Sequence, residues 1–133
     1  MKHLFTFLLL GLALLRAEVA HRYIDLGLIE SGTPIVDIRT PGEWKSTGLV
    51  KGAIPIMFFD ERGRYDVNAF LAALNARVDT TKPFALICNS GNRTGLVANF
   101  LSEKLHYNVI DIRGGILDAI AKKMPLQSYT EAP

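Results

Sequence analysis

The chain has 133 residues, which is the length of one domain with a single core, and 49% of them are hydrophobic. Its 15 lysines and arginines nearly balance its 13 aspartates and glutamates. This balance argues against a nucleic-acid-binding protein, because such proteins owe most of their affinity to basic patches.

Residues 1–17 have the pattern of a secretory signal peptide. Lys2 precedes an apolar run over residues 4–15, which is shorter than the ~20 residues that a bilayer-spanning helix needs. We predict export to the periplasm, cleavage after Ala17, a mature domain over residues 18–133 and no stable membrane anchor. An uncleaved amphipathic or buried helix and a retained membrane tether are the alternatives. Cleavage would remove two basic residues and leave 13 basic against 13 acidic ones.

The first half of the domain alternates short helical and strand patterns. Residues 22–31 predict a short helix, and the β-branched run over residues 34–39 predicts a buried strand. Thr40 is a candidate N-cap for a second short helix that ends near Gly48. Residues 50–57 contain glycine and proline, so we expect an irregular segment or an edge strand.

The second half has clearer elements. The apolar spacing after Asp66 predicts an amphipathic helix, and the next helix should carry its apolar side chains on one face. In chain order we predict an exposed loop over 58–65, a helix over 66–78, a strand over 84–87, a helix from Arg93 or Thr94 to about 107 with Leu96, Val97, Phe100, Leu101 and Leu105 on its apolar face, a strand over 108–112 and a helix over 116–123.

This alternation of strands and helices predicts an α/β fold whose parallel or mostly parallel sheet is covered by helices on both faces. Ligands of such sheets bind beyond the carboxyl ends of the strands. Cys88 lies directly after the strand over 84–87, so we expect it at the ligand edge. Arg39, at the end of its own strand, is a candidate to face the same crevice.

Cys88 is the only cysteine in the chain, and the segment that follows it, Asn89 to Thr94, is polar. A turn between a strand and a helix can aim backbone N–H groups inward, and the helix dipole and Arg93 would favour an anion there. The same field would lower the pKa of a thiol and favour the nucleophilic thiolate. Gly91 would give the backbone its freedom at the tightest point. The alternative is a buried, inert cysteine before an ordinary turn.

Other polar residues have structural interpretations beside functional ones. For Asp37, Arg39 and Glu43 a structural ion pair or cap is favoured over catalysis, and Trp44 is interpreted as a packing residue. His21 and His106 stand apart in the sequence, which is not the spacing of a metal site.

Three segments of the chain carry recognisable motifs: residues 88–93, residues 35–56 and residues 109–116. Together they resemble the rhodanese-like sulfurtransferase family. Cys88-Asn-Ser-Gly-Asn-Arg93 is similar to the family's CxxGxR loop. The stretch IVDIRTPGEWKSTGLVKGAIPI, residues 35–56, is similar to its D-x-R-x-P-x-E signature, and VIDIRGGI, residues 109–116, to its last strand and double glycine. The resemblance covers about residues 20–127 in the right order.

The resemblance implies a three-layer α/β fold with a central, mainly parallel five-stranded sheet. It also implies that Cys88 takes a sulfane sulfur from a donor anion such as thiosulfate and passes it to cyanide or a thiol, with no metal or organic cofactor. Donor and acceptor proteins are further candidate partners. The loop residues Asn89, Ser90, Gly91, Asn92, Arg93 and Thr94 would bind the donor. Asn89 stands where many members have arginine or lysine, so thiosulfate would lose one charge partner.

Two other functions stay open. Cysteine phosphatases and arsenate reductases of related architecture use a Cys-x5-Arg loop, one residue longer than the loop from Cys88 to Arg93. A thiol-binding module that traps partners as mixed disulfides is the second alternative, because export would place the thiol in an oxidising compartment. A binding domain of the same fold without catalysis is disfavoured by the retained thiol, glycine and arginine.

Overall fold

The computed structural model describes residues 17–131, and a five-stranded sheet forms its centre. The strands are ordered β1-β6-β5-β2-β4, and every neighbouring pair is parallel, as the predicted fold class requires. Crossovers between parallel strands need helices, which accounts for the alternation in the sequence. The strands are β1 Val19–Tyr23, β2 Ile35–Asp37, β4 Ile54–Pro55, β5 Phe84–Ile87 and β6 Val109–Arg113.

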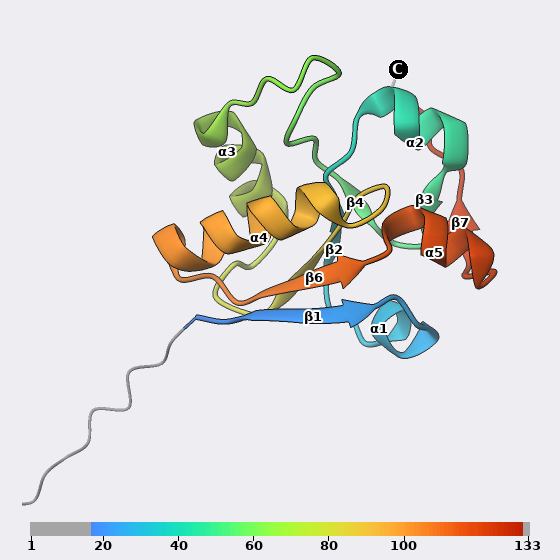
Figure 1. Cartoon of the computed structure of the whole chain (residues 1–133), viewed down its shortest axis with the longest axis horizontal. Coiled ribbons are helices and arrows are strands. Elements are labelled where there is room, and N and C mark those ends of the chain that lie inside the picture. Colours follow the sequence, from blue (N-terminus) through green and yellow to red (C-terminus); the bar gives the residue numbers. More distant parts are fainter. Residues whose placement is uncertain (1–16, 132–133) are drawn as a thin grey trace, which may run out of the picture.

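Helices cover both faces of this sheet (Figure 1). One face packs against α3 and α4 through Phe70, Leu74, Val97 and Leu101. The other packs against α1, α2 and α5, which bury Leu28, Trp44 and Ile116 among others. The prediction of three layers is therefore confirmed. The helices are α1 Leu26–Glu30, α2 Pro41–Thr47, α3 Val67–Arg77, α4 Asn92–Leu105 and α5 Gly115–Ala121.

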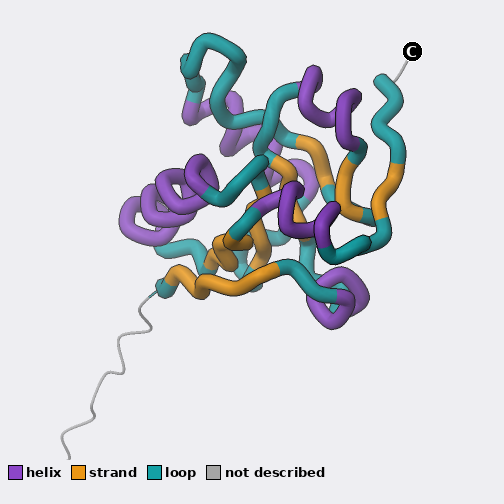
Figure 2. Tube along the Cα trace, turned by 45° about the vertical axis from the view of Figure 1, so that its right-hand side comes forward, coloured by secondary structure: helices purple, strands orange, loops and turns teal. Residues whose placement is uncertain are grey.

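A second, two-stranded sheet was not expected from the sequence. β3 Leu49–Val50 pairs antiparallel with β7 Leu126–Gln127, so the C-terminal segment lies beside α2, far from it in sequence (Figure 2). The rings of Trp44 and Tyr129 meet edge to face with centroids 5.2 Å apart. Trp44 is 5% exposed, which agrees with its prediction as a packing residue.

The prediction of a helix over residues 22–31 is wrong in its first half. Residues 19–23 form β1, which pairs with β6 along its whole length, and the helix begins only after the N-cap Asp25. Most of β1 is exposed, so its sequence lacks the apolar run that marks a buried strand. Pairing with a neighbouring strand overrides the local pattern here.

Two expectations about exposure also need correction. The sequence predicts an exposed loop at Phe58, but Phe58 is buried against Phe70, with ring centroids 4.8 Å apart; within the predicted loop only the residues from 61 onward are exposed throughout. The sequence also predicts Leu96 on the apolar face of its helix, but Leu96 is 67% exposed. Thr94 and Ala98 take the buried positions around it, because the helix turns small side chains toward the closely packed sheet.

The chain between β2 and α2 contains a buried ion pair. Asp37 and Arg39 are both fully buried, and the Nε and Nη2 of Arg39 donate to the Asp37 carboxylate at 2.9–3.2 Å. The remaining Arg39 donors reach Thr47 Oγ1 and Gly48 O, and Trp44 Nε1 donates to Asp37. Every partner is satisfied, as burial of two charges demands. The pair thus fixes α2 against the end of β2.

Among residues 17–131, no helix has the length and apolarity needed to cross a bilayer. The predicted signal peptide covers residues 1–17, and its part over residues 1–16, which includes the apolar run, lies outside the described residues.

Candidate active site

Cys88 follows β5 at the carboxyl edge of the sheet, where the sequence placed it. Its side chain is 1% exposed. Sγ accepts a hydrogen bond from Gly91 N at 3.2 Å and lies 3.7 Å from Thr94 Oγ1, which in turn donates to Gly91 O at 3.0 Å. The thiol thus sits inside its own loop, in contact with a backbone N–H and a hydroxyl.

The carbonyl groups of the loop are turned away from this interior. Ile116 N donates to Cys88 O at 2.8 Å and Leu117 N donates to Asn89 O at 3.2 Å. These donors come from the first turn of α5, whose N–H groups have no partners within the helix. Because α5 holds the carbonyls on one side, the loop can present N–H groups on the other.

Two glycines make this close approach possible. Gly91 has φ +101°, and a Cβ there would lie 3.1 Å from Gly114 N. Gly115 has φ +57°, and a Cβ there would overlap the carbonyl oxygens of Cys88 and Asn89. The sequence predicted the role of Gly91 but treated Gly115 only as part of a turn; the only signal in the sequence was the double glycine itself.

Helix α4 begins at Asn92, one or two residues earlier than the predicted start at Arg93 or Thr94, with Gly91 as its N-cap. It has 14 residues, so its dipole places partial positive charge beside the thiol. Within the loop Asn89 is partly buried, while Ser90 and Asn92 are exposed. Thr94 is fully buried. The loop therefore has one open side, lined by short polar side chains.

Arg93 is bound to an acid rather than left free. Its Nη1 and Nη2 donate to the two Glu43 carboxylate oxygens, both at 2.7 Å. Glu43 also forms a capping box with Thr40 at the start of α2. Glu43 therefore forms an ion pair and also caps a helix, as predicted. The ion pair with Arg93 links α4 to α2. Hydrogen bonding to Arg93 lowers the pKa of Glu43 from its ordinary value of 4.5.

This pairing predicts a pH-dependent loss of stability in Glu43→Gln. The folded-state pKa is lowered, so the pair stabilises the protein at pH values above 4.5 and this contribution is lost as the pH falls through the folded-state value. Because Glu43 is partly exposed, we expect a deficit of about 1 kcal/mol in the free energy of unfolding at neutral pH. Urea unfolding of the wild type and the variant at about pH 7 and about pH 3.5 measures this difference in the free energy of unfolding.

Glu103→Gln is the matched control, because Glu103 is an exposed acid on α4, the helix that carries Arg93, and pairs with no cation among residues 17–131. It should change stability little at either pH. A Glu43→Gln deficit that stays the same in acid would contradict the assignment of the stabilising charge to Glu43.

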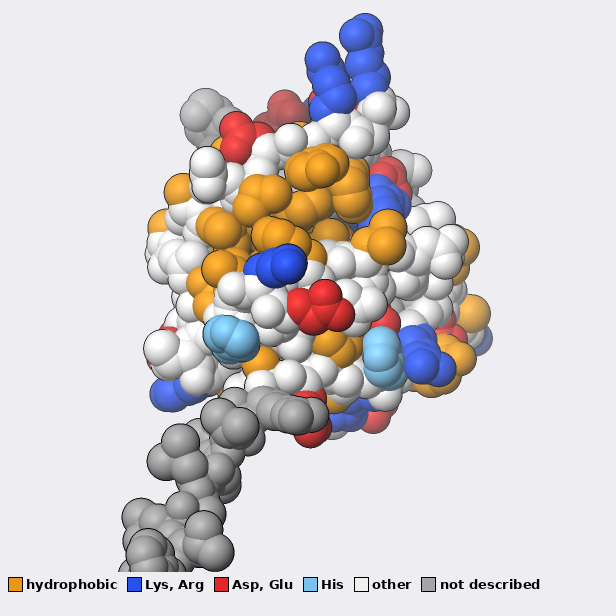
Figure 3. Space-filling model, turned by 60° about the vertical axis from the view of Figure 1, so that its left-hand side comes forward, with side chains coloured by type: hydrophobic (Ala, Val, Ile, Leu, Met, Phe, Trp, Pro, Cys, Tyr) orange, Lys and Arg blue, Asp and Glu red, His pale blue; other side chains and the backbone are white. Residues whose placement is uncertain are grey.

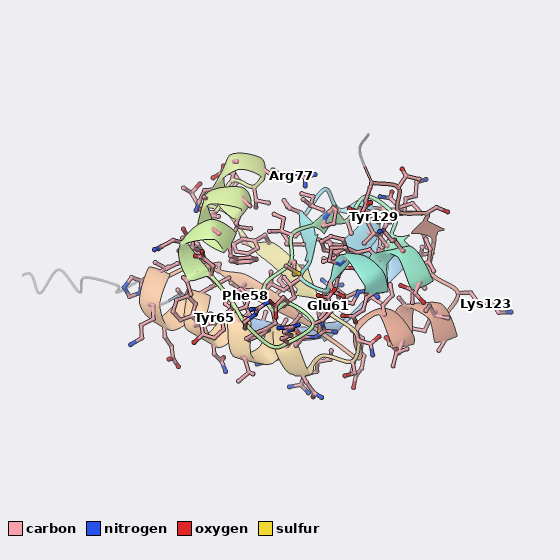
Figure 4. All side chains as sticks on the ribbon, turned by 90° about the horizontal axis from the view of Figure 1, so that it is seen from above. Phe58, Glu61, Tyr65, Arg77, Lys123 and Tyr129 are labelled. Atoms are coloured by element: carbon pink, nitrogen blue, oxygen red, sulfur yellow. The ribbon has the colours of Figure 1, made fainter. Side chains whose placement is uncertain are left out.

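Two grooves flank the segment over residues 58–66, and Cys88 lines neither. A groove of 510 Å³ lies between this segment, the end of β4 and α3, and one of 290 Å³ lies between the segment and α4. Phe58 and Tyr65 lie side by side (Figure 4), with ring centroids 5.7 Å apart. Hydrophobic side chains gather on the side of the molecule that lies to the left in Figure 1 (Figure 3).

The other predicted residues lie apart from the thiol's contacts. Arg39 donates only to Asp37, Thr47 and Gly48, as a structural residue would. His21 Nδ1 lies 2.8 Å from Asp111 Oδ2, between β1 and β6. Across residues 17–131, no three histidine, cysteine or acidic side chains lie close enough together to hold a metal ion.

The chain has counterparts among known proteins. A model of the rhodanese-like domain matches residues 20–122. An uncharacterised protein of Rickettsia prowazekii (strain Madrid E) is 28% identical over 92 residues, which cover 66% of this chain and 72% of that protein.

Two solved structures have a similar fold. A rhodanese-related protein from Thermoplasma volcanium has a TM-score of 0.61 at 24% identity, over 84% of this chain and 100% of that one. A protein of unknown function from Rhodopseudomonas palustris, described as a possible tyrosine phosphatase, has a TM-score of 0.53 at 25% identity, over 76% of this chain and 77% of that one.

Proposed function

This chain belongs to the rhodanese-like domain family, and on that premise we propose that it is a sulfurtransferase that carries a sulfane sulfur on Cys88. The observation that carries the proposal is the inward-facing loop: Sγ accepts from Gly91 N at 3.2 Å, while α5 binds the carbonyls of Cys88 and Asn89. N–H groups held in this way stabilise a sulfur anion without reorganising.

The proposed reaction has two steps. The Cys88 thiolate attacks the outer sulfur of a donor such as thiosulfate, the S–S bond of the donor breaks, and sulfite leaves with the bonding electrons. The resulting persulfide has an anionic terminal sulfur. Cyanide or a thiolate then attacks that sulfur, takes it as thiocyanate or a new persulfide, and returns Cys88 as a thiolate.

The neighbours of Cys88 fit both steps. The Gly91 N–H donates to Sγ and α4 points its positive end at the loop, and the same groups would face the terminal sulfur of the persulfide. Thr94 Oγ1 accepts from the Cys88 thiol at 3.7 Å and donates to Gly91 O, so this hydroxyl lies beside the sulfur. Both steps use only residues of this chain and the two substrates.

The test is the mass of the protein after exposure to a donor. We expect the reduced protein to gain one sulfur atom, about 32 Da, on Cys88 from thiosulfate, polysulfide or glutathione persulfide, and to lose it on addition of cyanide with release of thiocyanate. Protein treated first with iodoacetamide is the control. No gain of sulfur from any of the three donors, with Cys88 reduced, would refute the proposal.

A cysteine phosphatase is the second candidate, supported by the description of the Rhodopseudomonas palustris neighbour. Four residues separate Cys88 from Arg93, a smaller ring than the five of that class, and both terminal nitrogens of Arg93 are bound to Glu43. An arginine held in this way is poorly placed to bind phosphate as well. Cys88-dependent turnover of an aryl phosphate would favour this candidate, whereas capture of thiol partners without turnover would favour a thiol-binding module.

We also propose export to the periplasm, with cleavage after Ala17, from the signal-peptide pattern of residues 1–17 alone. Recovery of the protein from a bacterial periplasm tests the export, and the intact mass of the recovered protein tests the cleavage. A chain that still carries Met1 would refute the cleavage.

A further inference from the structure

Little free positive charge comes from the loop itself. Asn89 is neutral, and both terminal nitrogens of Arg93 are bound to Glu43 at 2.7 Å. An anionic sulfur donor would therefore meet backbone N–H groups and a helix dipole but no uncompensated side-chain cation from residues 88–94. A dianion such as thiosulfate needs more charge than this, because a helix end supplies only about half an elementary charge.

Arg113, the last residue of β6, stands next to this loop. β5 and β6 are paired with Leu86 opposite Asp111, so two residues further on Cys88 and Arg113 occupy neighbouring positions. Side chains alternate between the faces of a strand, and Val109, which has the same parity as Arg113, packs in the same cluster as Cys88. Arg113 therefore extends from the strand on the face that carries Cys88.

The distance is within reach of an arginine side chain. A Cβ on Gly91 would lie 3.5 Å from Arg113 Cα, and Gly91 N lies 3.2 Å from Cys88 Sγ. By these contacts Arg113 Cα is within about 9 Å of Sγ, and an extended arginine spans about 6 Å from Cα to its guanidinium. When the side chain extends toward the thiol, the two lengths leave at most about 3 Å, which an anion bound at Sγ can bridge.

The charge of Arg113 is also available. The side chain is exposed and takes part in none of the ion pairs within residues 17–131. The two nearest acids in sequence have other partners: Asp111 lies 2.8 Å from His21, and Asp118 lies 2.8 Å from Lys122.

We propose that Arg113 binds the anionic end of the sulfur donor and supplies the charge that Asn89 lacks. This inference rests on the proposed sulfur transfer and assigns the residue that would bind the oxyanion group of a donor such as thiosulfate. The guanidinium matches two oxygens of a sulfonate at once. It would hold the donor while the thiolate attacks the outer sulfur, and stabilise the sulfite that leaves when the S–S bond breaks.

The test compares Arg113→Gln and Arg113→Lys with Lys104→Ala. Lys104 is an exposed cation at the far end of α4, about 20 Å along the helix from the loop, so this control removes the same net charge elsewhere. The first readout is the rate at which Cys88 is alkylated by anionic iodoacetate relative to neutral iodoacetamide. The second is the single-turnover rate of sulfur gain from thiosulfate.

We expect Arg113→Gln to lower the iodoacetate-to-iodoacetamide rate ratio and the thiosulfate rate by about fivefold each. Arg113→Lys should keep most of the alkylation ratio and less of the thiosulfate rate, because an ammonium keeps the charge but not the two-pronged geometry. Lys104→Ala should match the wild type in both.

The two readouts separate this inference from the proposed function. An unchanged alkylation ratio in Arg113→Gln, or an equal fall in Lys104→Ala, would overturn the role of Arg113 even if sulfur transfer is real. A lowered ratio without any sulfur gain in the wild type would place an anion site at Arg113 but overturn its role toward a sulfur donor. A thiol that reacts with neither reagent would refute both, since no donor could reach Sγ.

Discussion

Replacing Cys88 with serine is expected to lower the rate of thiocyanate formation from thiosulfate and cyanide at least about 1000-fold. A serine hydroxyl does not ionise near neutral pH and forms no persulfide. Cys88 is the only cysteine in the chain, so no second thiol can replace it. The intact mass after exposure to thiosulfate should show no added sulfur.

The fold should survive this change. Cys88 is buried, and serine is slightly smaller, with an oxygen that can still accept from Gly91 N, as Sγ does at 3.2 Å. We expect the free energy of unfolding to change by about 1 kcal/mol. Cys88→Ala, which loses the acceptor and leaves the Gly91 N–H without a partner, should be equally inactive but less stable than the serine variant.

Either measurement can contradict this account. Sulfur transfer by Cys88→Ser within tenfold of the wild-type rate would exclude Cys88 as the sulfur carrier. A serine variant less stable than the alanine variant would show that the hydrogen bond from Gly91 does not stabilise the loop.

The central part of the site was predictable because its signals are local. The apolar run over residues 84–87 ends at the thiol, and Gly91 follows at the point where the chain must turn. A buried strand, a glycine with positive φ and an amphipathic helix each depend on the residues within them. Thr40 and Pro41, which begin α2 with a cap and a proline, are local in the same way.

The elements that were missed depend on partners distant in sequence. β1 is mostly exposed and exists because β6 pairs with it, and β7 pairs with β3 more than 70 residues away. Arg93 and Glu43 are 50 residues apart, so the sequence could place a charge beside the thiol but could not indicate that this charge is already paired. The structure shows that Arg93 is paired with Glu43. Arg113, which takes part in no ion pair within residues 17–131, is therefore the candidate for the cation that binds the donor.

Replacing Gly115 with alanine is expected to disrupt the loop without touching the thiol. A Cβ there would overlap the carbonyl oxygens of Cys88 and Asn89, and the backbone has φ +57°. To remove the overlap, α5 must move away and lose the hydrogen bonds from Ile116 N and Leu117 N to those oxygens. We expect the free energy of unfolding to fall by about 3 kcal/mol and the rate of sulfur gain from thiosulfate to fall at least about tenfold.

Gly52→Ala is the control for Gly115→Ala, because it introduces backbone strain without steric overlap. Gly52 has φ +82°, but a Cβ there would meet no atom within 4 Å, so this variant should lose only the about 1 kcal/mol that a left-handed alanine costs and keep full activity. Urea unfolding and single-turnover sulfur gain on both variants measure the difference. If Gly115→Ala were as stable and as active as Gly52→Ala, contact between α5 and the loop would not hold the carbonyls away from Sγ. The inward N–H groups, on which the proposed chemistry depends, would then need another cause.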